Sequence, residues 1–138
     1  QRGRALAVVL FDIDRFKAYN DHHGHAAGDE ALRAFVRVLS TRTRRMDLSA
    51  RYGGEEFITV LSGGTTGAAL RFAEAIRAAL DGEPHLEHKF TVSAGIAEYG
   101  PGMKSTADLI AAADSALYRA KADGRDRAYP HHATRAAG

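Results

Sequence analysis

The segment Ala5–Phe11 (ALAVVLF) is an unbroken run of apolar residues close to the start of the chain. Its length and its content of valine and leucine are typical of a β-strand that is covered on both faces. Such a strand needs neighbouring strands beside it and further elements packed above and below it. The run therefore predicts a layered fold around a central strand.

Three later segments carry apolar residues at helical spacing. The predicted helices are Asp29–Leu39, Ala68–Leu80 and Ser105–Ala122. Asp29 follows Gly28 and is well placed to cap the first of them. Gly82 and Pro84 close the second helix, and Gly124 stands where a left-handed residue commonly ends the third.

The remaining patterns indicate strands. Leu48–Tyr52 and Glu56–Leu61 flank Gly53 and Gly54, a dipeptide that accepts the positive φ angles of a tight hairpin turn. Phe90–Ile96 alternates apolar with small or polar residues, which predicts a strand half exposed to solvent. We therefore expect an antiparallel hairpin and a further strand.

The end of the chain is expected to contribute a short strand at Arg127–Tyr129 and a disordered tail at Pro130–Gly138. Residues 1–129 then form one domain, because 138 residues leave room for a single core. The order of strand, helix, hairpin, helix, strand and helix predicts an α+β fold. Its central sheet should be mostly antiparallel and flanked by helices.

Composition excludes several other classes of protein. With 45% apolar and 26% charged residues the chain has an ordinary globular composition, and no apolar run approaches the roughly 20 residues that cross a bilayer. The absence of cysteine excludes disulfides, thiolate zinc sites and a cysteine nucleophile, and it fits a reducing compartment. A net charge of +2 and the lack of an aromatic stacking platform argue against binding of a nucleic acid polymer.

Two pairs of acidic residues follow predicted strands. Asp12 and Asp14 come directly after the first strand, where a carboxylate can face a ligand without being buried, and Glu55 and Glu56 follow the Gly-Gly turn. If the hairpin lies beside the first strand, Asp12 and Glu55 approach each other, and like charges about 4 Å apart repel by roughly 4 kcal/mol. A divalent cation relieves this repulsion, and Mg²⁺ or Mn²⁺ takes such carboxylates as ligands. Taken alone, acidic residues at the end of a strand are common without any function, and a Gly-Gly-Glu-Glu segment is most often only a turn.

Other polar residues leave two interpretations open. His22, His23 and His25 are a competing metal cluster, although we favour solvated histidines in a loop. The cations Lys17, Lys121 and Arg125 could meet a polyphosphate or simply cover helix surfaces. Asn20 and Asp29 could read guanine, since a carboxylate accepts from both its N1–H and its N2 amine.

A group of arginines crowds one stretch in which Asp47 is the only acid. They are Arg37, Arg42, Arg44, Arg45 and Arg51. They could form an anion site, or they could complement the dipole and last carbonyls of the preceding helix.

Ordered motifs run through nearly the whole chain. They are Phe11–Lys17 (FDIDRFK), Asn20-Asp21, Gly24-His25, Gly28-Asp29, Arg51–Phe57 (RYGGEEF), Ser93–Ala97 (SAGIA), Asp114, Ala116–Tyr118, Ala120-Lys121 and Gly124-Arg125. In this order and spacing they resemble the GGDEF family of bacterial diguanylate cyclases. The resemblance implies a core similar to adenylate cyclases and polymerase palms. It also implies that two GTP molecules, one on each of two facing subunits of a homodimer, condense to cyclic di-GMP and two pyrophosphates.

The resemblance also implies roles for individual residues. Asp12 and Glu55 would hold two Mg²⁺ (or Mn²⁺) ions with the Ile13 carbonyl, and Glu56 would assist the metals or accept the proton of the attacking ribose 3′-hydroxyl. The substrate-binding set is Asn20 and Asp29 on guanine, Leu32 in the pocket wall, and Lys17, Lys121, Arg125 and the backbone amides of Arg15 and Phe16 on the phosphates. Relatives that make mixed cyclic dinucleotides tend to carry serine in place of Asp29, so this chain should prefer GTP.

Upstream of the hairpin, Arg44-Arg45-Met46-Asp47 matches the RxxD inhibitory site of the family. Arg44 would bind a phosphate or a guanine edge of cyclic di-GMP, and Asp47 would accept from the base. Some relatives add an arginine from the next helix, where ungapped spacing puts Ala75. Arg71 and Arg77 lie nearby on different turns.

The family normally begins with an Asp-x-Leu-Thr-Gly-Leu-x-Asn-Arg segment and a helix, and only Gln1–Arg4 stand in that place. We therefore expect an N-terminally trimmed cytoplasmic domain whose parent carries an upstream sensory or dimerising module and any membrane attachment. The alternative function is a catalytically inactive receptor for GTP or cyclic di-GMP with the same fold. The intact GGEEF sequence argues against that alternative.

Overall fold

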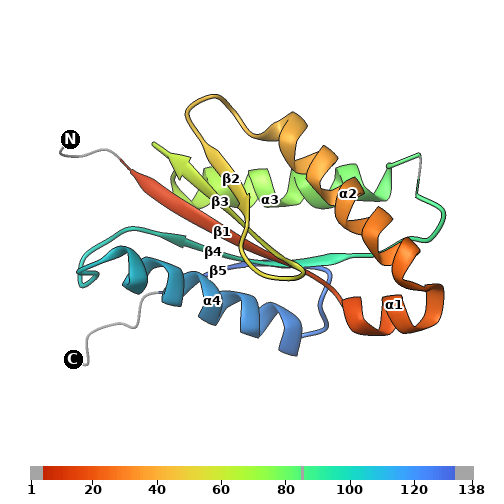
Figure 1. Ribbon diagram of the computed structural model, residues 1–138. Helices are drawn as coiled ribbons and strands as arrows, with labels where there is room; N and C mark the ends of the chain where they lie inside the picture. The colour runs from red at the N-terminus through yellow and green to blue at the C-terminus, as the bar shows by residue number, and fades with distance from the viewer. Residues whose placement is uncertain (1–4, 85, 133–138) are drawn as a thin grey trace.

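The computed structural model describes residues 5–84 and 86–132, which form one mixed sheet and four helices (Figure 1). The strands are β1 (Leu6–Ile13), β2 (Leu48–Arg51), β3 (Glu56–Ser62), β4 (Val92–Glu98) and β5 (Ala128–Pro130). The helices are α1 (Phe16–His23), α2 (His25–Arg42), α3 (Thr66–Asp81) and α4 (Thr106–Ala122). The strand order is β2-β3-β1-β4-β5, and β5 alone pairs in parallel among these strands. The predicted α+β class with a mostly antiparallel sheet is confirmed.

The central strand β1 is covered on both faces, as its apolar run predicts. Val9, Phe11 and Ile13 belong to the core that contains the buried residues of α2 and α3. Val8 and Leu10 point to the opposite face and pack with buried residues of α4. Figure 1 shows the same arrangement, with α2 and α3 on one side of the sheet and α4 on the other. The period of two along β1 therefore puts Asp12 on the α4 side of the sheet.

The strand β4 differs from its prediction, because six of its seven residues are buried and only Glu98 is half-buried. The cause is the close packing of α4. A side chain at Gly95 would overlap backbone atoms of Ala113 and Leu117. The small residues of this strand thus reflect the approach of a helix backbone and not exposure to solvent.

The N-terminal helices also differ from their predictions. α2 begins at His25, so Asp29 lies inside the helix and does not cap it. His22 and His23 are not in a loop but in the last turn of α1, a helix that buries only Tyr19 and therefore shows little amphipathic pattern. The ring of His23 stacks on that of His88, with 3.8 Å between centroids.

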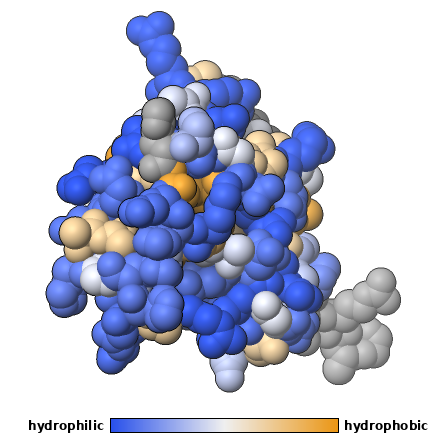
Figure 2. Space-filling model, turned by 90° about the vertical axis from the view of Figure 1, so that its right-hand side faces the viewer, coloured by the Kyte–Doolittle hydropathy of each residue, from blue (hydrophilic) through white to orange (hydrophobic). Residues whose placement is uncertain are grey.

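At the other end of the chain, β5 extends to Pro130, one residue into the predicted tail, and the amide of His131 donates to the Ile96 carbonyl. The rest of that predicted tail, residues 133–138, lies outside the described residues. The face that carries α1 and the loop before β4 is mostly hydrophilic, with small apolar patches (Figure 2). None of the helices within the described ranges is long and apolar enough to cross a membrane.

Candidate active site

The sheet brings three carboxylates to the end of β1. Asp12 pairs directly with Glu56 of β3 in the antiparallel register. Cross-strand partners project to the same face of a sheet, so both side chains lie on the α4 side. The amide of Ile13 donates to the carbonyl of Glu55 at 3.1 Å, which ties the Gly-Gly turn to the end of β1. The predicted convergence of Asp12 and Glu55 is therefore present.

The hairpin turn is held by backbone groups and one arginine. The amides of Tyr52 and Gly53 both donate to the Glu56 carbonyl, at 2.7 and 3.1 Å. The Arg51 Nε donates to the Gly53 carbonyl at 3.1 Å, and its guanidinium also binds the Gly54 carbonyl. The positive φ angles predicted at the two glycines do not occur. Gly53 instead leaves room for the side chain of Glu56, because a Cβ there would lie 2.5 Å from the Glu56 Oε1.

The carboxylates of Asp12, Glu55 and Glu56 repel one another in a partly buried environment. Burial raises the pKa of Glu55 to about 7, and Asp12 adds to this increase through a hydrogen bond and through its charge. Asp12 is 5% exposed, whereas the sequence predicts a carboxylate that faces a ligand without being buried. The reason is α4, whose Lys121 Nζ donates to the Asp12 Oδ2 at 2.5 Å.

This set of side chains fits a divalent cation. Asp12, Glu55 and Glu56 are hard oxygen donors, and the single ammonium of Lys121 leaves their negative charge uncompensated. Within the described ranges, no group of three or more histidine or acidic side chains already surrounds a common point as metal ligands do. The charges of Asp12 and Glu56 contribute to the raised pKa of Glu55, and a bound cation would relieve this repulsion by favouring the ionised carboxylate.

Asp14 lies two residues further along and has different surroundings. Its Oδ1 accepts from the Ser93 hydroxyl at 2.6 Å, and its Oδ2 accepts from the Thr91 hydroxyl at 2.6 Å and from the Asp126 amide at 3.0 Å. The sequence gives no signal for these partners. Asp14 is buried, again unlike the prediction, and it joins β1, β4 and the loop after α4. It acts as a structural anchor beside the acid cluster.

The residues predicted to bind phosphates have different surroundings. Arg15 begins α1 in a left-handed conformation, and no side chain of the described residues caps the amides that follow it, including that of Phe16. Arg15 and Arg125 line one pocket of about 420 Å³. Lys17 is 91% exposed and pairs with Asp21. Lys121 reaches the site but contacts Asp12.

The residues predicted to read guanine lie where α1 meets α2. The Oδ1 of Asn20 is buried and has no hydrogen-bond partner among the described residues. A Cβ at Gly28 would overlap this oxygen, so Asn20 lies against the backbone next to Asp29, which is exposed. Leu32 is half-buried and lines an apolar cavity of about 320 Å³ with Phe57.

The predicted inhibitory residues contact each other. The Arg44 Nε lies 3.4 Å from the Asp47 Oδ2, and the Arg44 side chain is 76% exposed. The Asp47 side chain is 2% exposed and accepts from the Ser62 amide at 3.1 Å through its Oδ1. Arg77 points away from this pair and binds Glu74 and Asp126, whereas Arg71 is exposed.

Comparisons with known proteins identify the family. A family model described as "Diguanylate cyclase, GGDEF domain" matches residues 1–127. Diguanylate cyclase DgcM of Escherichia coli is 44% identical over 126 residues, which cover 88% of this chain and 30% of that protein. Diguanylate cyclase A of Treponema denticola is 37% identical over 92% of this chain and 35% of its own length. The chain thus spans about a third of the curated relatives it matches.

Solved structures give the same assignment. The active GGEEF domain of a diguanylate cyclase from Vibrio cholerae has a TM-score of 0.89 and 33% identity, with 95% of this chain and 85% of that chain covered. The GGDEF domain of DgcB from Caulobacter crescentus, in complex with c-di-GMP, has a TM-score of 0.86 and 32% identity over 94% and 79% of the two chains. These neighbours confirm the predicted palm-like cyclase fold. The chain therefore belongs to the GGDEF-domain family of diguanylate cyclases.

Proposed function

We propose that this chain is the catalytic domain of a diguanylate cyclase, which condenses two GTP into cyclic di-GMP and two pyrophosphates in the cytoplasm. Membership of the GGDEF family supports the reaction class. The observation that carries the proposal is the pairing of the Asp12 and Glu55 carboxylates at the end of β1. Two neighbouring carboxylates, one of which raises the pKa of the other, are suited to hold cations beside a triphosphate.

In the proposed reaction, Asp12 and Glu55 hold two Mg²⁺ or Mn²⁺ ions together with the Ile13 carbonyl. Bound metal ions neutralise developing charge on the phosphates and favour ionisation of the attacking hydroxyl. Glu56 lies opposite Asp12 in the register. In this position it either assists the metals or accepts the proton of the ribose 3′-hydroxyl. Lys121 keeps a positive charge next to Asp12, where it can also attract the phosphates of GTP.

The base of GTP is bound between α1 and α2. The buried Oδ1 of Asn20 lacks a partner within the described residues, and an amine of guanine would supply one. Asp29 accepts from the N1–H and N2 amine of guanine, which adenine does not offer, and Leu32 forms part of the pocket wall. Lys17, Arg125 and the amides of Arg15 and Phe16 bind the phosphates.

Each site holds one GTP, so catalysis requires two copies of the chain that face each other. The rate per chain should therefore rise with protein concentration and level off when the homodimer is saturated. Mixing an inactive variant with the wild type should lower the rate further than dilution alone.

We also propose product inhibition at the RxxD site. Arg44 is exposed and available for a phosphate or a guanine edge, and Asp47 is fixed to the end of β3. Arg77 is engaged elsewhere, and Ala75 lacks a polar side chain, so α3 adds no arginine from these two positions. Arg44→Ala should abolish inhibition by added cyclic di-GMP and leave the initial rate unchanged.

Incubation with GTP and Mg²⁺ followed by chromatography for cyclic di-GMP tests the proposal. The wild type should form the dinucleotide, Glu55→Gln should form none, and the exposed control Glu87→Gln should match the wild type. Binding of GTP or cyclic di-GMP without turnover, including by a longer parent protein, would instead identify a receptor of the same fold.

A further inference from the structure

We infer that Arg77 is a positioning residue that holds the loop 124–126 and thereby places Arg125 for the phosphates of GTP. The inference rests on the proposed function, which assigns Arg125 to the triphosphate. Arg77 lies on α3, outside the acid cluster and outside the RxxD pair. Its role follows from the contacts of its guanidinium, the backbone of the loop it binds and the link from that loop to Asp14.

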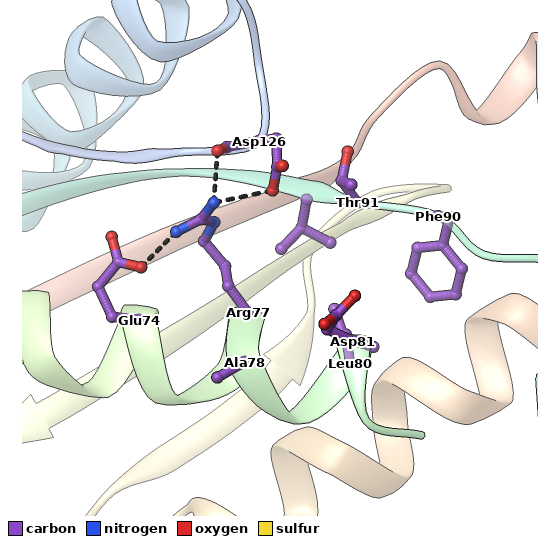
Figure 3. A pocket seen from close by; sticks show the side chains of 9 residues that line it. Glu74, Arg77, Ala78, Leu80, Asp81, Phe90, Thr91 and Asp126 are labelled. Atoms are coloured by element: carbon purple, nitrogen blue, oxygen red, sulfur yellow. Dashed lines mark hydrogen bonds and ion pairs between the residues drawn. The ribbon is translucent and has the colours of Figure 1, made fainter. Parts of the chain in front are cut away.

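The guanidinium of Arg77 spans the gap between α3 and the loop after α4. Its Nη2 donates to the Asp126 Oδ1 at 2.8 Å and also to the Asp126 carbonyl, and its Nη1 donates to the Glu74 carboxylate. Figure 3 shows these contacts at the edge of a pocket of about 370 Å³. The guanidinium thus fixes both the side chain and the backbone of Asp126.

Asp126 also connects Arg77 to the end of β1. Its amide donates to the Asp14 Oδ2 at 3.0 Å. Asp126 is therefore held from two sides, by the guanidinium of α3 at its carbonyl and by the carboxylate of Asp14, just after β1, at its amide. Arg125 directly precedes this doubly held residue, so its backbone cannot move independently of the two contacts.

The loop needs such a restraint because of its backbone conformation. Gly124, Arg125 and Asp126 have φ angles of 126°, 63° and 50°, three consecutive positive values. Residues other than glycine disfavour this region, and two of them in succession persist only where the surroundings enforce them. Without Arg77 the loop can relax toward negative φ, and such a change redirects the Arg125 side chain.

The burial of Arg77 supports a dedicated role. Its side chain is 21% exposed, and its Nε is buried without a hydrogen-bond partner among the described residues. Removing an arginine from water is costly unless its charge is paired, and here the pairing groups are Asp126 and Glu74. Arg125 makes no ion pair with an acidic residue in the described part of the chain, so its guanidinium is available to an anion.

The test compares binding of two probes in the presence of Mg²⁺, a non-hydrolysable GTP analogue and guanosine, which lacks phosphates. Arg77→Met should weaken binding of the GTP analogue about tenfold and change guanosine binding less than twofold. Arg77→Lys should recover part of the loss, because its ammonium can still donate to Asp126. Arg71→Met, an exposed arginine on the same helix, serves as the matched control and should bind both probes like the wild type.

Equal losses for both probes would show a merely structural role, and an unchanged affinity of Arg77→Met for the analogue would also overturn the inference. If Arg77→Met does not fold, Asp126→Asn replaces it, because the carbonyl contact remains; about a threefold loss for the analogue alone is then expected. Failure of the proposed function would be seen in the wild type itself, which would then form no cyclic di-GMP from GTP, whether or not it binds the GTP analogue.

Discussion

Asp12 and Asp14 lie two residues apart on one strand end, yet their surroundings are opposite. Asp14 accepts from three uncharged donors that belong to Ser93, Thr91 and Asp126. Asp12 has one ammonium, that of Lys121, and lies beside Glu55 and opposite Glu56. A carboxylate whose lone pairs are filled by protein donors fixes structure. One that faces other carboxylates retains the capacity to bind a cation.

The largest effect should come from Asp12→Asn, which leaves the shape of the site and removes one ligand charge. We expect cyclic di-GMP formation to fall by at least about a thousandfold, or ~4 kcal/mol of the barrier. The midpoint of thermal unfolding should hardly change, since the loss of the Lys121 pair is offset by relief of repulsion with Glu55. Initial rates and thermal unfolding measure the two effects.

Asp21→Asn is the matched control for this change, because Asp21 is an exposed acid on α1 that pairs only with Lys17. It should retain the activity of the wild type. An Asp12→Asn chain that keeps a tenth of the wild-type rate would refute the assignment of Asp12 as a metal ligand.

Asp14 should give the reverse result. Asp14→Ala leaves the Ser93 hydroxyl, the Thr91 hydroxyl and the Asp126 amide without their acceptor, so the free energy of unfolding should fall by about 3 kcal/mol. Urea unfolding of Asp14→Ala and Asp12→Asn in parallel measures the contrast. A loss below about 1 kcal/mol would mean that water replaces the missing carboxylate and that Asp14 is no anchor.

The sequence predicts one side of this comparison better than the other. Local patterns predict an apolar strand and a Gly-Gly hairpin that each end in acids, and Asp12 and Glu55 converge because the hairpin lies beside that strand. The partners of Asp14 come from positions 77, 79 and 112 residues further along the chain, and periodicity cannot reveal such long-range contacts. Asp12 and Asp14 therefore look alike in sequence.

The elements that were predicted wrongly share a physical cause, which is tertiary packing. The burial of β4 depends on a helix backbone that packs against Gly95, and Gly28 within α2 lies against Asn20 of α1. Likewise, the inward direction of Arg77 depends on a loop that lies 49 residues away in sequence. The local sequence pattern around each of these residues does not include its contact partner.

The acid cluster should also depend on pH. Because burial and Asp12 raise the pKa of Glu55 to about 7, the folded metal-free chain retains a proton that an unfolded chain releases near 4.5. The stability of the metal-free fold should therefore decrease as pH rises through this window. Mg²⁺ requires the ionised form, so its affinity should be about tenfold weaker at pH 6 than at pH 8.

Calorimetric titration with Mg²⁺ at the two pH values measures this difference. Glu55→Gln is the control, because it should bind Mg²⁺ weakly at both pH values and lose the dependence. Persistence of the full tenfold change in Glu55→Gln would assign the proton to another group.

The smallest effect should come from Gly53→Ala. Neither glycine of the turn has a positive φ, so alanine suits the backbone, and stability should change by less than about 0.5 kcal/mol. The new Cβ meets the Oε1 of Glu56, the movable end of a side chain, which should shift and lower the rate of cyclic di-GMP formation about threefold. Gly54→Ala is the matched control, since a Cβ there meets nothing within 4 Å. If the two alanines lower the rate equally, the position of the Glu56 carboxylate has no part in the reaction, and catalysis depends on Asp12 and Glu55 alone among these acids.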